Sequence, residues 1–572
     1  MEKNTLKRQN LIELIILLMI IVVANVMGTY WFTRWDMTDE HRYTLNETTK
    51  DILSNLDDVV FVKIYLDGEM PAGFQRLRKA LHDMLDEFRI YGGDNVQYKF
   101  VNLNSYDEKR RKDIYNQLYK QGLDPITVYE KSSAGVKSEK ILFPGAIMSF
   151  KNKDFPINFL EQALNKTPDE NLNASVQDLE YKLINALYKL RLEKKKSIAV
   201  IQGHRELEVD YLRDILESLS NDYKITLLTI NHQLKALKDY EAIIIPAPRS
   251  KIDKFDKFII DQYIMKGGKV LWLVDGTNAD LDSLADKNMF LAMDMVGHIN
   301  LSRMLFQYGV RINPDLIQDL QCSAIPINTS IAGTDPKFDL FPWVYEPLMI
   351  PSNKSVITKN INLVQGNFTS SIDTVGDDGL VKKTILLTTS KYTRLLNVPV
   401  QVSISAALNK RPDANMFLLS YVPTAVLLEG SFKSLYAHRI PPEIEQNKEI
   451  AFQEKSVRPT KMIVVADGDV IKNQIHHVKG QVVPYPLGYD KYTGQSYGNK
   501  DFILNAVNYL MDDVGLLSVR AKDIKLRLLD KTIVAKNRSL IQWINLLSPI
   551  ILLLLLGIFY MFITRKKYKV RN

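Results

Sequence analysis

A long apolar run lies near each end of the chain, and shorter patterns of apolar and polar residues lie between the two runs. Residues 11–32 and residues 541–563 are almost without charge, and each ends in aromatic side chains. About twenty apolar residues are enough for a helix to cross a bilayer core, and aromatic rings favour its interfaces. We expect a membrane-spanning helix at each end. A cleavable signal peptide is the alternative for the first run, although no small-x-small site follows it; a buried core helix is the alternative for the second.

Between the runs, residues 33–160 predict a first α/β domain. A β-branched and aromatic stretch, an amphipathic helix ending at Gly92-Gly93 and a second such stretch form a βαβ pattern. Thr44 and Glu47 have capping-box spacing, so a helix is expected to begin there. The domain is expected to be thioredoxin-like, but it has no Cys-x-x-Cys, which excludes redox chemistry of that kind. The expected strands are 59–66, 96–103, 126–129 and 141–150, and the expected helices 44–55, 73–91 and 107–121.

Residues 174–515 predict a larger, Rossmann-like domain. Its expected helix at residues 175–192 opens the domain, and strands then alternate with helices at a spacing typical of a parallel sheet covered on both faces. From about residue 320 to 430 the pattern changes to short strands broken by Pro, Asn and Gly, which predicts a β-rich insertion or edge. The expected strands of the sheet are 197–201, 223–230, 241–245 and 269–274, with helices at 209–219 and 253–265.

Ligands of such sheets bind beyond the carboxyl ends of the strands. Three predicted strand ends carry polar side chains there, and together they suit an anion or a small polar ligand. Tight turns and helix capping would also explain these residues. The candidate ligand-binding residues are Gly203, His204, Arg205, Glu206, Arg249 and Asp275.

Asp467 and Asp469 follow a further expected strand, at residues 461–466. Two carboxylates with Asn473 nearby could hold Mg²⁺ or Ca²⁺, which prefer oxygen ligands. Asp-x-Asp alone is a weak metal signal, and one of the two can instead cap the helix that follows. We therefore predict no cofactor and no metal, and keep the pair as weak metal candidates.

The distribution of charge indicates how the chain is oriented in the membrane. The formal charge is +8, yet the tails at residues 1–10 and 564–572 hold eight Lys or Arg against Glu2, and the remainder is close to neutral. This balance gives no support for nucleic-acid binding. Basic tails stay on the cytoplasmic side, so we expect both termini to be cytoplasmic and residues 33–539 to lie on the outer face. A single cysteine in so long an outer segment fits a bacterial periplasm, so we expect a bacterial inner-membrane protein. The membrane-proximal segment, 516–540, is also basic. Cys322 stands alone, which excludes an intramolecular disulfide.

The motifs that the sequence lacks limit its activity. It has no Gly-x-x-x-x-Gly-Lys-Ser/Thr, so direct ATP binding of the transporter-ATPase kind is excluded. It has no His-Glu-x-x-His, no Gly-x-Ser-x-Gly and no paired-cysteine zinc pattern. We expect no enzymatic activity. The chain also has no further run of spans from which a permease pore could form.

Several stretches carry a resemblance to a known family. Arg34-x-Asp36-x-Thr38 lies outside the first run, and Tyr43-Thr44-Leu45 opens the first expected helix. The other matching stretches are residues 425–434, 461–473, 486–490 and 497–505. Together they resemble the auxiliary, substrate-binding-like component of ABC transporters, in the branch associated with gliding motility in the Bacteroidetes. The resemblance implies a separate ATPase, a separate multi-span permease, and a role in gliding motility and associated secretion.

Two other functions stay open on the sequence. The chain could be a structural envelope tether whose outer part binds another protein. It could also be a membrane-bound hydrolase built on His204, Arg249 and Asp275, although no nucleophile accompanies the histidine.

Overall fold

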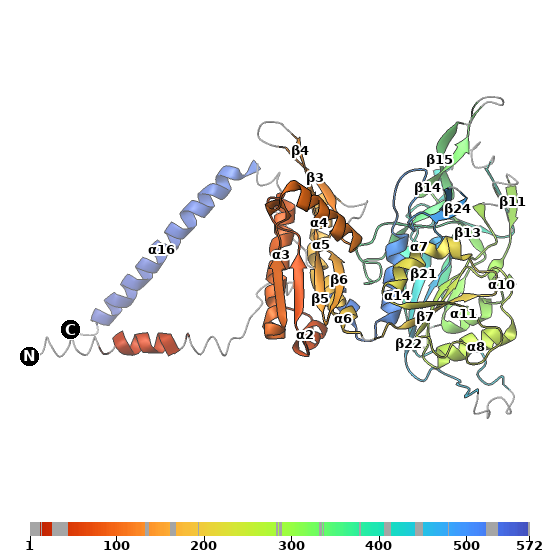
Figure 1. Cartoon of the computed structure of the whole chain (residues 1–572), viewed down its shortest axis with the longest axis horizontal. Coiled ribbons are helices and arrows are strands. Elements are labelled where there is room, and N and C mark those ends of the chain that lie inside the picture. The colour runs from red at the N-terminus through yellow and green to blue at the C-terminus, as the bar shows by residue number, and fades with distance from the viewer. Residues whose placement is uncertain are drawn as a thin grey trace, which may run out of the picture. The chain divides into compact units, whose positions relative to one another are not determined.

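The computed structural model shows a mixed α/β chain with several sheets (Figure 1). It divides into two compact units, residues 1–522 and residues 523–572, which are described separately. The structure describes residues 12, 14–23, 25, 44–131, 137–160, 167–192, 194–281, 284, 289–330, 335, 337–376, 379–404, 413–440, 450–478, 480–521 and 536–569.

The first domain is built on a four-stranded sheet of order β2-β1-β5-β6. Strands β1 (Val60–Ile64) and β2 (Val96–Phe100) are parallel and are joined through α3 (Ala72–Gly92), which confirms the predicted βαβ unit. The apolar face of α3 is buried on the sheet through Leu77, Leu81 and Leu85. Helix α4 (Glu108–Lys120) is capped by Asp107, whose side chain accepts a hydrogen bond from the backbone of Arg110.

Two expectations for this domain are wrong in detail. Helix α2 (Glu47–Ser54) is capped by Asn46, which accepts a hydrogen bond from Thr48 N, and not by Thr44. The single strand expected at 141–150 is two strands, because the chain turns at Phe143-Pro144 and a proline has no N–H for a ladder. Strand β4 (Lys137–Leu142) pairs with β3 (Ile126–Lys131), whereas β5 (Gly145–Phe150) pairs with β1 and with β6 (Lys153–Asn158).

The helix expected to open the second domain packs on the first. It is two helices, α5 (Pro168–Gln177) and α6 (Leu179–Arg191). Leu183 and Leu187 of α6 lie in the same apolar core as Val62 of β1. The start of the predicted membrane-proximal segment, the 3₁₀ helix η5 (Leu516–Ala521), contributes Leu516 and Leu517 to that core. The apolar spacing of α6 therefore showed correctly that the helix is buried, but not which sheet buries it.

The second domain is organised by one long sheet of order β14-β15-β18-β21-β22-β10-β9-β7-β8. Its strands from β10 to β8 are all parallel, as predicted, and β22 joins them in the same direction, whereas those from β14 to β21 are antiparallel. The strands of the parallel half are β7 (Ser197–Gln202), β8 (Lys224–Thr229), β9 (Ala242–Pro246), β10 (Lys269–Leu273) and β22 (Thr460–Val465).

Helices cover both faces of the parallel half, which explains why its strands are continuously apolar. In β10, Val270 and Trp272 enter one core, and Leu271 and Leu273 enter the core on the opposite face. One face is covered by α8 (Lys254–Met265) and α11 (Ser302–Tyr308). The other is covered by α7 (Val209–Ser220) and α14 (Asn499–Met511).

The predicted β-rich insertion continues the same sheet at one edge. The strands β14 (Cys322–Asn328), β15 (Phe338–Pro351), β18 (Val381–Thr388) and β21 (Pro423–Gly430) form its antiparallel half. Smaller pairs surround it. These are β11 (Met289–Ala292) with β20 (Val400–Ser403), β12 (Val310–Ile312) with β17 (Ile372–Thr374), β13 (Asp315–Asp319) with β19 (Thr393–Asn397), and β23 (Ile475–Val478) with β24 (Gln481–Pro484); β16 (Val364–Gln365) pairs with β15.

The second unit contains α16 (Arg538–Lys569), whose segment Arg538–Phe562 is long and apolar enough to cross a membrane. It is the one such helix among the residues that the structure describes, and none of its apolar window is buried inside the protein. Near the N-terminus, Leu14–Val23 is a shorter apolar helix, and the rest of the span predicted at 11–32 lies largely outside the described residues.

Candidate functional site

The parallel strands β7, β9, β10 and β22 bring all the predicted polar strand ends to one edge of the sheet. Since the four strands are neighbours and run in the same direction, the residues that follow them emerge side by side. The structure nevertheless sorts these residues into two groups. Arg249, Asp275, Asp467 and Asp469 form one group, and His204 with Glu206 belongs to another.

In the first group, a single guanidinium lies between two carboxylates. Arg249 Nη2 is 3.5 Å from Asp275 Oδ2 and 3.5 Å from Asp469 Oδ1. The second oxygen of Asp275 accepts a 2.6 Å hydrogen bond from Gly468 N, which ties the end of β10 to the loop after β22. Gly468 is required at this point, because an added Cβ would lie 2.4 Å from Ala247 Cβ and 2.9 Å from Asp275 Oδ1.

Asp467 is the buried centre of this group. Its Oδ2 accepts hydrogen bonds from Asn367 N at 2.7 Å and from Thr369 Oγ1 at 2.5 Å. Its Oδ1 accepts from Asp469 N at 2.9 Å and so caps the 3₁₀ helix η4 (Gly468–Ile471). The capping alternative from the sequence is therefore confirmed for Asp467, which holds the β-rich part of the domain against the parallel half.

Three carboxylates with one guanidinium between them are electrostatically unbalanced. Burial raises the pKa of Asp275 to about 6, with a further contribution from repulsion by Asp469 and an opposing one from Arg249. Burial, followed by repulsion from Asp275 and Asp469, raises the pKa of Asp467 well above its usual range. The group therefore favours a positive charge or a proton.

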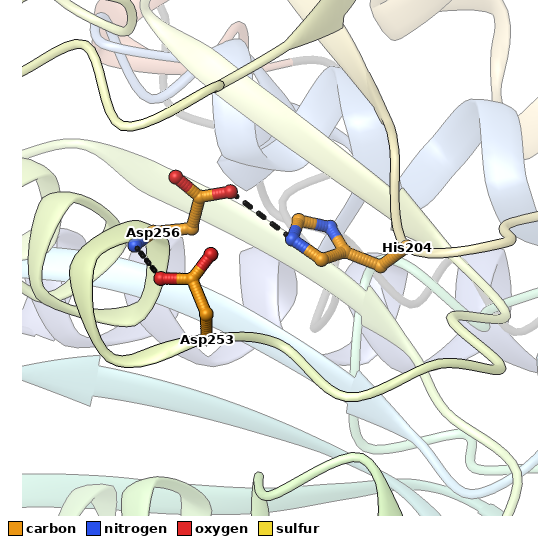
Figure 2. A group of neighbouring side chains, drawn as sticks. All are labelled: His204, Asp253 and Asp256. Atoms are coloured by element: carbon orange, nitrogen blue, oxygen red, sulfur yellow. Dashed lines mark hydrogen bonds and ion pairs between the residues drawn. The ribbon is translucent and has the colours of Figure 1, made fainter.

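His204 and Glu206 lie away from that guanidinium. His204 Nδ1 is 3.1 Å from Glu206 Oε1. Its Nε2 is 3.1 Å from Asp256 Oδ2 at the start of α8 (Figure 2). Burial lowers the pKa of His204, but the hydrogen bond to Glu206 and the charges of Glu206 and Asp256 outweigh burial and raise it overall. His204 reaches the first group only through its backbone carbonyl, which accepts hydrogen bonds from Arg249 N and Ser250 N at 3.0 and 2.8 Å.

The remaining two predicted residues have structural roles in the turn. Gly203 has a φ of 118°, a conformation that favours glycine, and an added Cβ would lie 2.8 Å from Thr229 Cγ2. Arg205 has a φ of 58° and is exposed. Neither contributes a side chain to the group around Arg249.

A cleft of about 440 Å³ opens beside the first group, between the parallel half of the sheet and the β-rich part. Asp469 lines it, which connects the strand-end group to the open volume. Aromatic rings, amides and two lysines make up much of the remaining lining. These residues are Tyr211, Gln365, Asn367, Lys472, Asn473, Gln474, Tyr489, Lys491, Tyr492 and Asn499, with Glu346 beside them.

Glu346 is a site residue that the sequence reasoning missed. It is buried in β15, accepts hydrogen bonds from Ser323 Oγ and from Gln365 Nε2, and has a pKa that burial raises to about 7. A signal for it exists in the sequence. Glu346 is the lone charged residue in the otherwise apolar stretch at residues 341–351, and a charge there is kept only with partners or a function.

Comparison with known proteins gives the following matches. The family model described as "ABC-type uncharacterized transport system" matches residues 195–506, more than half of the chain, and includes the strand ends and the cleft. A model described as a domain of unknown function matches residues 39–149. Among curated proteins there is no match. A solved structure titled "mmIFT52 N-terminal domain" aligns at 12% identity and a TM-score of 0.32, covering 56% of this chain and 99% of that one, a likeness that supports no conclusion about fold or function.

Proposed function

The chain belongs to the family described as ABC-type uncharacterized transport system, and from this premise we propose that it is a membrane-anchored auxiliary, substrate-binding-like subunit that works with a separate ATPase and a separate multi-span permease. The family match is the observation that carries the proposal. The absence of a phosphate-binding Gly-x-x-x-x-Gly-Lys-Ser/Thr motif from the sequence supports a separate ATPase.

Helix α16 supports the anchor. Its length suits a bilayer, its apolar surface is not covered within its own unit, and a basic tail follows it. The proposal includes the second span at residues 11–32, a bacterial inner-membrane location with both termini cytoplasmic, and a periplasmic region between the spans. The proposal also includes a role in gliding motility and its associated secretion, which rests on the motif resemblance alone.

The cleft supports the binding role. Ligand sites in proteins are concave and combine aromatic surface with a few placed polar groups, and the cleft beside Asp469 has both. Its carboxyl groups, Asp469 and Glu346, and its amides suit a polar ligand that donates hydrogen bonds. We do not assign catalysis to it, since both ring nitrogens of His204 are already engaged by carboxylates elsewhere.

Purification in a mild detergent, with mass spectrometry of the proteins that accompany the tagged chain, tests the proposal. Stoichiometric recovery of an ATPase and a multi-span permease is the expected result. Asn545→Leu should reduce that recovery roughly three- to tenfold, since a polar side chain in lipid contributes about 1 kcal/mol to helix association. Leu546→Ile on the same helix is the matched control. Recovery of the chain alone, or with envelope proteins only, would reject transport in favour of a structural tether.

Orientation needs its own experiment. In a Cys322→Ser background, Lys112→Cys reports on the first domain and Arg565→Cys on the C-terminal tail. A membrane-impermeant maleimide applied to spheroplasts should label the first variant and spare the second until the membrane is opened. The reverse pattern would overturn the proposed orientation.

A further inference from the structure

A compact set of metal-binding side chains lies where β7 meets the start of α8. One ligand atom from each of His204, Asp253 and Asp256 lies within 4.8 Å of the other two (Figure 2). His204 and Asp256 are buried, and Asp253 is half-buried. Imidazole nitrogen and carboxylate oxygen are the donors that Zn²⁺ takes in catalytic and structural sites without cysteine.

A fourth donor approaches from the loop after β8. His232 Nδ1 is 3.4 Å from Asp253 Oδ2 and 3.3 Å from Asp256 Oδ1. Asp256 lies between the two imidazoles, with its Oδ2 3.1 Å from His204 Nε2 and its Oδ1 facing His232 Nδ1. Bonds of 2.0–2.1 Å around tetrahedral zinc place neighbouring ligand atoms about 3.3 Å apart. Two carboxylates would also balance the charge of a divalent ion.

Hydrogen bonds outside the donor set hold the ligands in place. Glu206 accepts from His204 N at 2.6 Å and contacts His204 Nδ1 at 3.1 Å, so that Nε2 is directed at Asp256. A carboxylate on the far nitrogen of a histidine is the usual outer support of a zinc ligand. Asp253 is held similarly, because its Oδ1 caps α8 through Phe255 N and Asp256 N while its Oδ2 faces His232.

We propose that this chain binds one Zn²⁺, or a divalent ion of similar preference, through His204 Nε2, Asp253, Asp256 and His232 Nδ1. The ion would join the end of β7, the loop after β8 and the first turn of α8. It would also fix the loop at Arg249, because the backbone carbonyl of His204 accepts hydrogen bonds from Arg249 N and Ser250 N. The ligands differ from Asp467 and Asp469, the weak metal candidates of the sequence, and the proposal does not depend on the transport role.

Zinc titration of the full chain in detergent, purified through a tag without histidine and stripped with a chelator, tests the proposal. The expected result is one Zn²⁺ per chain by calorimetry and elemental analysis. Co²⁺ in its place should give the intense visible absorption of a tetrahedral ion. Zn²⁺ should also raise the melting temperature, because an ion that binds only the folded state stabilises it.

Two variants remove ligands while sparing the fold. His232→Ala removes an imidazole whose side chain is 55% exposed, and Asp253→Asn keeps an acceptor for the helix cap. Each should weaken zinc binding roughly tenfold or more. His438→Ala is the matched control, since His438 is also an exposed histidine 3.1 Å from a carboxylate, that of Glu454. The proposal is overturned if the unaltered chain binds less than one Zn²⁺, or if the two variants bind zinc as well as the control does. Either result would show that His204 is a buried, ion-paired histidine and not a metal ligand.

Discussion

Replacing Glu346, which lines the cleft, with glutamine should abolish the loss of folding stability that ionisation of this residue causes as the pH rises. Burial raises the pKa of Glu346 from 4.5 to about 7, against the opposing effect of its hydrogen bonds with Ser323 and Gln365. The folded state therefore holds a proton that the unfolded state releases between these values, and stability falls as the pH rises through this window. The difference between the two pKa values corresponds to about 3 kcal/mol of folding free energy. About 2.5 kcal/mol of this is lost between about pH 5 and about pH 8.

Hydrogen exchange measured on peptides covering β15 gives the local free energy of opening, which is better defined than a single melting point for a chain of several domains. The unaltered chain should show protection that falls from about pH 5 to about pH 8 once intrinsic exchange rates are divided out. Glu346→Gln should be nearly flat over the same range. Its protection at about pH 8 should exceed that of the unaltered chain by about 2 kcal/mol.

Asp339→Asn is the matched control for this experiment. Asp339 lies on the same strand, but its side chain is 43% exposed, and hydrogen bonds from Thr329 and Lys337 lower its pKa. The control should therefore reproduce the pH dependence of the unaltered chain across this range. If Glu346→Gln does so as well, the carboxyl group is already ionised in the folded state and the assignment of a raised pKa is wrong.

Three further predictions follow from the second domain. Asp275→Asn should flatten the pH dependence of protection in β10 between about pH 4 and about pH 6, because the raised pKa of Asp275, about 6, makes the ionised form cost about 3 kcal/mol. Gly468→Ala should destabilise by about 1–3 kcal/mol in denaturant titration, because its new Cβ meets Ala247. Trp272→Ala should cost about 3–5 kcal/mol, and Trp272→Phe much less, because the buried indole N–H has no hydrogen-bond partner among the described residues.

The parallel half of the long sheet was predictable because it depends on local composition. Strands buried on both faces read as unbroken apolar runs, and β9 and β10 are of this kind. The placement of polar residues at their carboxyl ends followed from the same pattern. Helix capping was less certain, since Thr44 and Asn46 are both good caps and only the path of the chain selects the second.

The hydrogen-bond partners of the site residues could not be predicted from the sequence, because they come from distant segments of the chain. Asp467 is bound by Asn367 and Thr369, about a hundred residues earlier. His204 was expected beside Arg249, but Asp256 in the first turn of α8 holds its side chain instead. The periodicity of apolar residues along the chain gives no information about such pairings. The lone Glu346 in an apolar strand is the exception, since its cost of burial is visible without knowing its partners.

The two domains are connected in a way that bears on the proposed role. The chain enters the second domain from α6 and leaves it into η5, and both elements belong to the apolar core of the first domain. Both connections lie at the amino ends of the parallel strands, where Asp513 pairs with Lys196 and Lys269, at the opposite edge of the sheet from the strand-end loops. From η5 the chain continues toward α16, the proposed anchor. The second domain is therefore joined to the first through packed elements at both of its ends, because α6 and η5 share one apolar core.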